Sequence, residues 1–307
     1  MSADLLTSLL QSTVTMAIPL LLAALGELIA ERGGMINIGL EGMLLTGAFA
    51  AMAGTYFTAM PVLGLLAAWV SGLVLAALFA YVVVVHSANQ VVVGTAINLL
   101  ALGLTGVAYR GIFGVTGAAL TVTGFAALPI PGLSSLPIVG PGLFTLTWLG
   151  YLAFALVPLI AFGLFKTIPG LKLRMVGENP RAAAAQGVAV EWTQTSALLA
   201  CGILAATAGA YLAVAYAHTF VEGMSSGRGF IALAIVIFGR WSPAGILGAA
   251  LLFGLATALQ FHVQALGLPI PYQFLLMLPY VLTLLVLAGY AGTTHAPAAL
   301  GVPLENE

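Results

Sequence analysis

Eight long apolar runs occupy most of the chain, each close to the roughly 20 residues that a helix needs to cross the hydrocarbon core of a bilayer. Charged residues make up 6% of the 307 residues and hydrophobic residues 62%, whereas soluble domains carry about 25% charged residues. The sequence therefore predicts an all-α, polytopic transmembrane bundle forming a single domain, 1–307. The predicted spans are 14–30, 43–60, 62–85, 91–109, 146–165, 193–217, 246–263 and 272–290.

A ninth run, 230–239, is apolar but too short to span comfortably. It could be a broken helix, or a tilted span that includes its flanks. Counting it as a crossing gives about nine spans, within a range of eight to ten.

The positions of lysine and arginine predict the orientation, because cytoplasmic loops carry an excess of both. Four of the eight positive residues lie in the connection 166–192, which we expect in the cytoplasm. The connection 111–145 has no charged residue and is expected outside. With nine crossings, the N-terminus lies outside and the tail 291–307 in the cytoplasm. Arg110, at the outer end of its span, is expected to snorkel toward the interface.

The densest polar group, 26–42, lies between two apolar runs and holds Glu27, Glu31, Arg32 and Glu41 with several glycines. Irregular backbone is tolerated in a membrane only where it is packed in protein or faces water. One interpretation is a broken helix near a translocation path, near 31–42, held by an ion pair between Arg32 and a carboxylate. The other is an ordinary cytoplasmic turn with its charges at the headgroups.

A second polar group, 222–229, precedes the short apolar run, so that a broken or short helix is predicted near 222–240. Short, glycine-interrupted segments in transporters often mark a substrate site. Gly223, Ser225 and Gly227 also match G-x-S-x-G, but that pattern implies a hydrolase only on a strand-to-helix elbow. No strand context and no downstream Asp accompany it, so we do not expect a nucleophilic serine.

The connection 166–192 contains Asn179-Pro180, four alanines and then Gly187. Asn is a good helix cap, and Pro suits the first turn. The pattern predicts a short helix of small residues that could dock on a cytoplasmic partner. A simple solvated loop is the alternative.

These segments resemble the permease subunits of bacterial nucleoside and simple-sugar ABC importers, a superfamily that includes ribose-type and branched-chain amino acid permeases. The resemblance rests on E-R-G-G-M-I-N-I-G-L-E-G-M from 31, N-Q-V-V-V-G-T-A-I-N-L-L from 89, and G-R-G-F-I-A-L-A from 227 with G-R-W-S-P from 239. The loop 177–183 carries G-E-N-P-x-A-A. Arg181 stands where the related E-A-A-x-x-x-G coupling pattern has a glutamate, which fits a separate branch.

The resemblance implies a permease that pairs with a second homologous permease chain, a cytoplasmic ATPase subunit and an extracytoplasmic substrate-binding lipoprotein in a prokaryotic inner membrane. It implies coupling to the ATPase through Gly177, Glu178, Asn179, Pro180, Arg181, Ala182, Ala183 and Gly187. Candidate polar groups of the translocation path are Asn37, Glu41 and Asn98. A structural polar signature comprises Glu31, Arg32, Gly39, Gly42 and Arg228.

The chain itself is not expected to be an enzyme, because its sequence has no P-loop pattern G-x-x-x-x-G-K-[ST]. We expect no cofactor and no metal in it, with ATP and magnesium bound by the partner ATPase. The net charge of −1 argues against nucleic acid as a partner. A stand-alone, ion-coupled secondary transporter is the alternative function, and nucleoside, purine and simple sugar all remain open as substrates.

Overall fold

The computed structural model describes residues 3–114, 120–265 and 296–302, with a few isolated positions between the last two ranges. In these residues every regular element is a helix, and Ala127 and Thr147 form an isolated bridge. The elements are α1 (Ala3–Arg32), α2 (Leu40–Thr58), α3 (Pro61–Ala80), the π-helical turn η1 (Tyr81–Val85), α4 (Gln90–Phe113), α5 (Val139–Leu143), α6 (Trp148–Lys166), α7 (Ile168–Glu178), α8 (Pro180–Ala185), α9 (Val190–Ala210), the π-helical turn η2 (Tyr211–Tyr216), α10 (Arg228–Phe238) and α11 (Pro243–Ala265).

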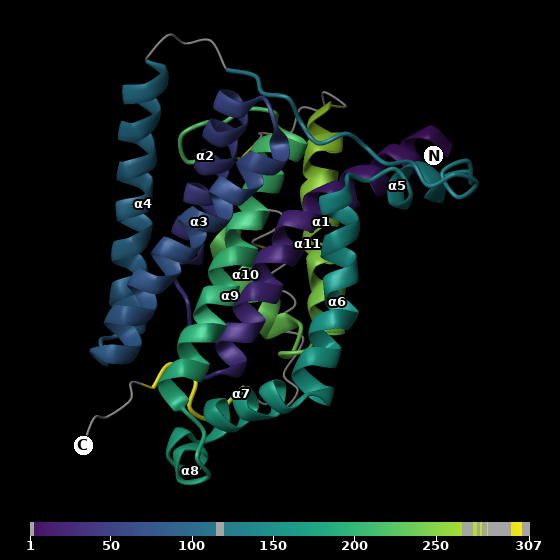
Figure 1. Cartoon of the computed structure of the whole chain (residues 1–307). Helices are drawn as coiled ribbons and strands as arrows, with labels where there is room; N and C mark the ends of the chain where they lie inside the picture. Colours follow the sequence, from purple (N-terminus) through teal and green to yellow (C-terminus); the bar gives the residue numbers. More distant parts are fainter. Residues whose placement is uncertain are drawn as a thin grey trace.

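The long helices run roughly alongside one another, with α4 at one edge of the bundle, α6 at the other, and α1 and α9 between them (Figure 1). Helix α5 and the N-terminus project at one end of the bundle. Helices α7 and α8 lie at the opposite end, where α7 crosses the bundle instead of following it. The two ends therefore differ in architecture.

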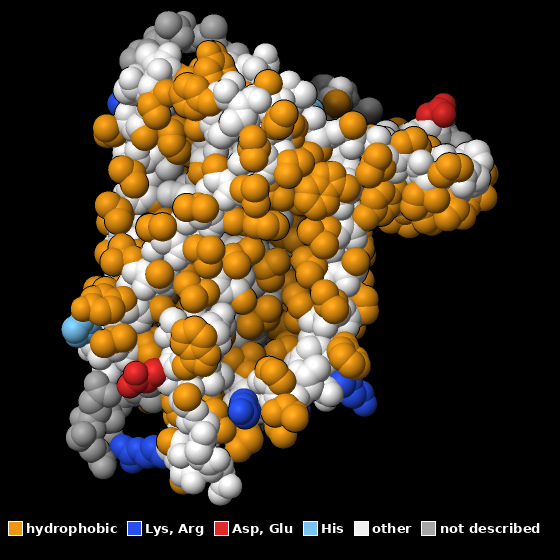
Figure 2. Space-filling model, viewed as in Figure 1, with side chains coloured by type: hydrophobic (Ala, Val, Ile, Leu, Met, Phe, Trp, Pro, Cys, Tyr) orange, Lys and Arg blue, Asp and Glu red, His pale blue; other side chains and the backbone are white. Residues whose placement is uncertain are grey.

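Within the residues that the structure describes, six helical stretches are long and apolar enough to cross a membrane. The surface in Figure 2 is apolar over its middle, and most of its lysine and arginine side chains lie at the end formed by α7 and α8. The predicted polytopic helical bundle is confirmed, but the count of nine spans is not. The six stretches are Asp4–Arg32, Pro61–Val85, Gln90–Phe113, Trp148–Lys166, Val190–Tyr216 and Pro243–Ala265.

Three predicted crossings are not among those six. Run 43–60 is α2, which has 19 residues but carries Glu41 in its first turn. Run 230–239 is α10, with 11 residues, so its length is about 16 Å, roughly half the hydrocarbon thickness. Run 272–290 lies outside the described residues, apart from isolated positions, as does most of the tail 291–307.

Small residues allow α9 to pack closely against its neighbours in the core. A Cβ atom on Gly47 of α2 would lie 2.5 Å from the Cα of Ala206. One on Gly202 would lie 2.5 Å from the Cβ of Ala76 on α3. Small residues are the usual means by which membrane helices bring their backbones together, because lipid supplies no hydrophobic force between them.

Candidate functional site

The start of α10 is bound to the start of α2 through the carboxylate of Glu41. Its two oxygens accept hydrogen bonds from the backbone nitrogens of Gly227 at 2.7 Å and Gly229 at 2.6 Å. Gly229 also lies so close that a Cβ atom there would be 2.6 Å from the Cα of Glu41. The first N–H groups of a helix have no partner within it and carry partial positive charge, so a carboxylate is well placed there. Glu41 thus caps a half-length helix.

Asn98 of α4 holds the other side of the same segment. Its Oδ1 accepts from the backbone nitrogen of Gly42 at 2.8 Å, and its Nδ2 donates to the carbonyl of Ile38 at 2.9 Å. A Cβ atom on Gly42 would lie 2.9 Å from Ala101, and one on Gly39 would lie 3.2 Å from Ile97. Glu41 and Asn98 therefore flank one irregular turn, where the backbones of α2, α4 and α10 converge.

Removing the Glu41 carboxylate is expected to destabilise this junction. In Glu41→Ala the N–H groups of Gly227 and Gly229 lose their partners, and each unsatisfied buried group costs about 1–3 kcal/mol. The apparent melting temperature of the detergent-solubilised chain should therefore fall clearly, with Glu41→Gln falling less because its amide retains one acceptor oxygen. Glu191→Ala removes an exposed carboxylate from the first turn of α9 and serves as the matched control. Equal melting temperatures for Glu41→Ala and Glu191→Ala would contradict the capping role.

Asn37 is fully buried beneath the turn. Its backbone nitrogen donates to Glu27 at 2.8 Å, and its side-chain amide donates to the sulfur atoms of Met43 at 3.3 Å and Cys201 at 3.4 Å. In this conformation Asn37 therefore contacts other core residues, whereas Glu41 and Asn98 are half-buried.

The other end of α10 is bound to the end of α1. Arg32 donates from Nε at 3.1 Å and from Nη2 at 2.6 Å to the carbonyl of Trp241, and the indole of Trp241 donates to Glu31. The ion pair expected between Arg32 and a carboxylate is not found in the described residues, since Arg32 binds a carbonyl and lies 5.6 Å from the ring centre of Phe165. Both ends of α10 are thus attached to segment 31–42.

Arg228, which begins α10, binds the preceding turn. Its Nη1 donates to the carbonyl of Met224 at 3.0 Å and to that of Ser225 at 3.2 Å. Ser225 is 2% exposed, and helix α10 follows a run of irregular turns rather than a strand. The setting of this serine thus lacks the strand of a nucleophile elbow.

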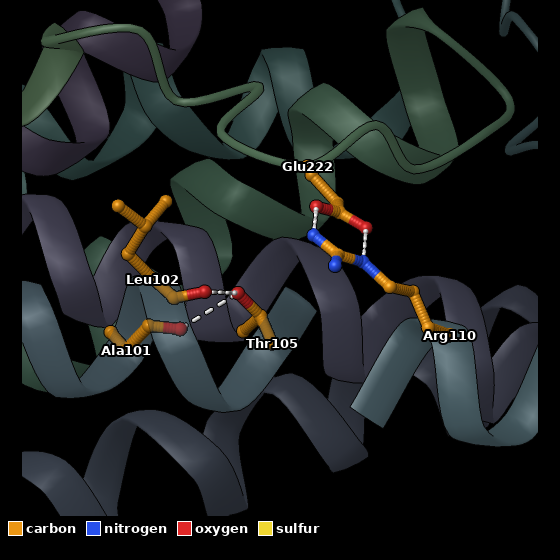
Figure 3. A network of polar contacts seen from close by, with 5 residues as sticks. All are labelled: Ala101, Leu102, Thr105, Arg110 and Glu222. Atoms are coloured by element: carbon orange, nitrogen blue, oxygen red, sulfur yellow. Dashed lines mark hydrogen bonds and ion pairs between the residues drawn. The ribbon is translucent and has the colours of Figure 1, made fainter. Parts of the chain in front are cut away.

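An exposed ion pair joins α4 to the connection between η2 and α10. Arg110 reaches Glu222 with two hydrogen bonds, at 2.8 and 2.6 Å, as Figure 3 shows beside Thr105 of the same helix. The expectation that Arg110 only snorkels is therefore wrong. These hydrogen bonds hold the pKa of Glu222 below its ordinary value, so that the carboxylate remains charged at neutral pH. The ion pair therefore links α4 to the segment that leads into Gly227 at the start of α10.

The connection 166–192 forms two short helices, α7 and α8. The side chain of Asn179 accepts from the backbone nitrogen of Ala182 at 3.0 Å and caps α8, with Pro180 in the first turn. Gly187 ends the segment with a φ of +78°, a conformation that glycine adopts without strain. The predicted short helix is present, and Ala183 is buried while Ala182 is exposed. Helix α8 lies at the extreme end of the molecule, where a partner can reach it (Figure 1).

Residues 296–302 bind across this end of the molecule. The backbone nitrogen of Ala299 donates to the carbonyl of Gly177 at 2.9 Å, and that of Gly301 donates to the carbonyl of Gly34 at 3.0 Å. A Cβ atom on Gly177 would collide with the carbonyl of Arg32. The segment therefore bridges α7 to the turn after α1, and Gly177 has a packing role besides its place in the predicted coupling loop.

Comparison with known proteins gives a consistent result. The family model of the branched-chain amino acid transport system / permease component matches residues 9–287. The chain belongs to this permease family. The guanosine ABC transporter permease protein NupQ of Bacillus subtilis is 39% identical, over 98% of this chain and 97% of that protein. The nucleoside ABC transporter permease protein NupC of Lactococcus lactis is 37% identical over 92% of each chain. The putative glucose ABC transporter permease protein TsgC13 of Haloferax volcanii is 38% identical over 85% of this chain and 79% of that protein. No solved structure is significantly similar.

Family membership confirms the resemblance found in the sequence motifs. The permease is a multi-pass membrane transport subunit and not the ATPase. In Lactococcus lactis both NupC and a second nucleoside ABC transporter permease protein, NupB, match this chain, the latter at 33% identity over 33% of it. That organism therefore has two permease chains related to this one.

Several residues that join separate segments of the permease were not predicted from the sequence. Gln90 accepts from the backbone nitrogen of Ile36 at 2.7 Å, and Trp241 binds both Glu31 and Arg32. Both residues lie within the motifs on which the family resemblance rests, and that resemblance was the only signal in the sequence that they matter. For the pairing of Arg110 with Glu222 the sequence held no signal, because 112 residues separate them.

Proposed function

We propose that this permease forms half of the membrane path of an ATP-binding cassette importer for nucleosides. The observation that carries the proposal is its similarity, over nearly the whole chain, to permeases named for guanosine and nucleoside transport. The exposed helix α8 supports it, since a protruding helix of small residues suits a groove on an ATPase subunit. The chain would then share its path with a second, homologous permease chain.

The proposed arrangement has about nine crossings in one domain, with the N-terminus outside and the C-terminal tail 291–307 in the cytoplasm. The lysines and arginines around α7 and α8 support this orientation. The coupling loop 166–192 would receive the ATPase subunit, which binds ATP and magnesium. The outer loop 111–145 would receive an extracytoplasmic binding lipoprotein. Between them, Asn37, Glu41 and Asn98 remain candidates for the path, because they lie at the junction of broken helices in the bundle.

A sugar is the second candidate substrate, favoured by the similarity to a putative glucose permease. Uptake into proteoliposomes holding the complete complex distinguishes the two. We expect labelled guanosine to accumulate only when ATP is present on the ATPase side, with ionophores having no effect and excess glucose not competing. Accumulation of glucose but not guanosine would contradict the nucleoside assignment. Guanosine uptake by the isolated chain, driven by an ion gradient without ATP, would overturn the importer and favour a secondary transporter.

A further inference from the structure

A groove between α6 and α9, with α7 at its end, lies outside the site described above. It encloses a cavity of 560 Å³, within the range of about 300–1,000 Å³ that is usual for small-molecule sites. We name it the α6–α9 groove. Its lining includes Leu159 and Gly163 of α6, Lys172 of α7, and Trp192 and Ser196 of α9.

The groove is open at the outer surface of the bundle. Helix α6 is one of the six candidate spans. Leu159 is 62% exposed and lines the groove, and Phe162 beside it is 60% exposed. An apolar groove on the outer side of a spanning helix is filled by lipid unless a protein covers it. An acyl chain can therefore enter the groove directly from the bilayer.

The α7 end of the groove favours a negative charge. Lys172 is the one charged residue among the described residues that line it. Helix α9 begins beside it, at Val190, and its N-cap Ala189 supplies no side-chain hydrogen bond. The first N–H groups of α9 therefore add partial positive charge at this end, which the carboxylate of Glu191 in the same turn partly offsets without lining the groove. Trp192, 69% exposed, is the type of residue that is enriched at the membrane–water boundary.

We propose that the α6–α9 groove binds one anionic phospholipid of the cytoplasmic leaflet, with an acyl chain against α6 and its phosphate beside Lys172 and the start of α9. The inference rests on the proposed orientation, which places α7 on the cytoplasmic side. The lipid packs against α7, and α7 leads directly into α8. The lipid thus supports the segment proposed to receive the ATPase.

Quenching of Trp192 fluorescence by brominated lipid tests the proposal. The complete complex is placed in nanodiscs of phosphatidylcholine that contain a varied fraction of acyl-brominated phosphatidylglycerol, or of acyl-brominated phosphatidylcholine. The signal of Trp192 is the difference between the unaltered complex and Trp192→Phe. We expect brominated phosphatidylglycerol to quench Trp192 at about fivefold lower lipid fraction, the effect of one lysine near an anionic headgroup.

Three variants locate the binding. A Cβ atom on Gly163 meets no atom within 4 Å, so Gly163→Leu fills the groove without displacing backbone and should remove the preference for phosphatidylglycerol. Lys172→Gln should also remove the preference, while quenching by either lipid persists. The matched control is Gly248→Leu on α11, where a Cβ atom likewise meets nothing within 4 Å. This variant should retain the preference for phosphatidylglycerol.

Equal quenching by the two lipids, or an unchanged preference in Gly163→Leu, would overturn the lipid site. Absence of quenching by either lipid would overturn it too, since it would show that a protein covers the groove. Nucleoside uptake is measured separately in proteoliposomes. Intact ATP-driven uptake without lipid preference counts against the lipid site alone, whereas lipid preference without uptake counts against the proposed function alone.

Discussion

Replacement of Ala182 by Glu is expected to abolish ATP-driven guanosine uptake by the complete complex while leaving the chain folded. Ala182 is exposed on α8, so the new side chain fits in the free permease but would be buried without a partner in the proposed contact between α8 and the ATPase. An unpaired charge buried in an interface costs about 2–5 kcal/mol, which corresponds to at least about a thirtyfold loss. The loss is measured in proteoliposomes as the rate of guanosine uptake and the rate of substrate-stimulated ATP hydrolysis.

The structure shows which positions on this loop give a clean test. Ala183 is buried against Val176 and Val188, and Gly187 has a positive φ, so charges at these two positions would disturb the loop itself. Ala296→Glu is the matched control, because Ala296 is exposed in the docked C-terminal segment and lies off α8. If Ala182→Glu transports as well as Ala296→Glu does, α8 is a solvated connection and the coupling role is wrong.

Substitution of Gly209 by Leu is expected to remove most of the folded chain from the membrane. A Cβ atom at this position in α9 would collide with the carbonyl oxygen of Leu44 and lie 2.6 Å from the backbone nitrogen of Ala48, both on α2. Overpacking typically costs about 1–3 kcal/mol. We expect the cost of Gly209→Leu to lie at the upper end of this range or above it, because backbone atoms cannot move aside as a side chain can. The measurement is the yield of monodisperse chain after detergent extraction and size-exclusion chromatography.

Gly248→Leu makes the same chemical change within α11, at an exposed position with no atom within 4 Å of the added Cβ. Both substitutions raise helix propensity equally, so the difference between them reports only the contact between α2 and α9. Similar yields from the two variants would show that the close approach of these helices does not determine folding.

The sequence pointed to both broken segments, because charged and glycine residues are conspicuous between apolar runs. It could not show that Glu41 caps α10, since the carboxylate and the Gly227 nitrogen are 186 positions apart. Nor could it show that Arg32 binds the Trp241 carbonyl. A polar group in a membrane protein must find some partner, but which partner it finds depends on the packing of the helices that carry both groups.

The sequence by itself determined the membrane class, most spanning segments and the helix capped by Asn179, because hydropathy and capping act over a few neighbouring residues. Only the tertiary structure decided that α10 is a half-length helix bound at both ends to segment 31–42. It also decided that Arg110 pairs with Glu222 and that residues 296–302 bridge Gly34 and Gly177. These contacts join residues distant in the chain, and their geometry exists only once α1, α2 and α9 have packed against one another.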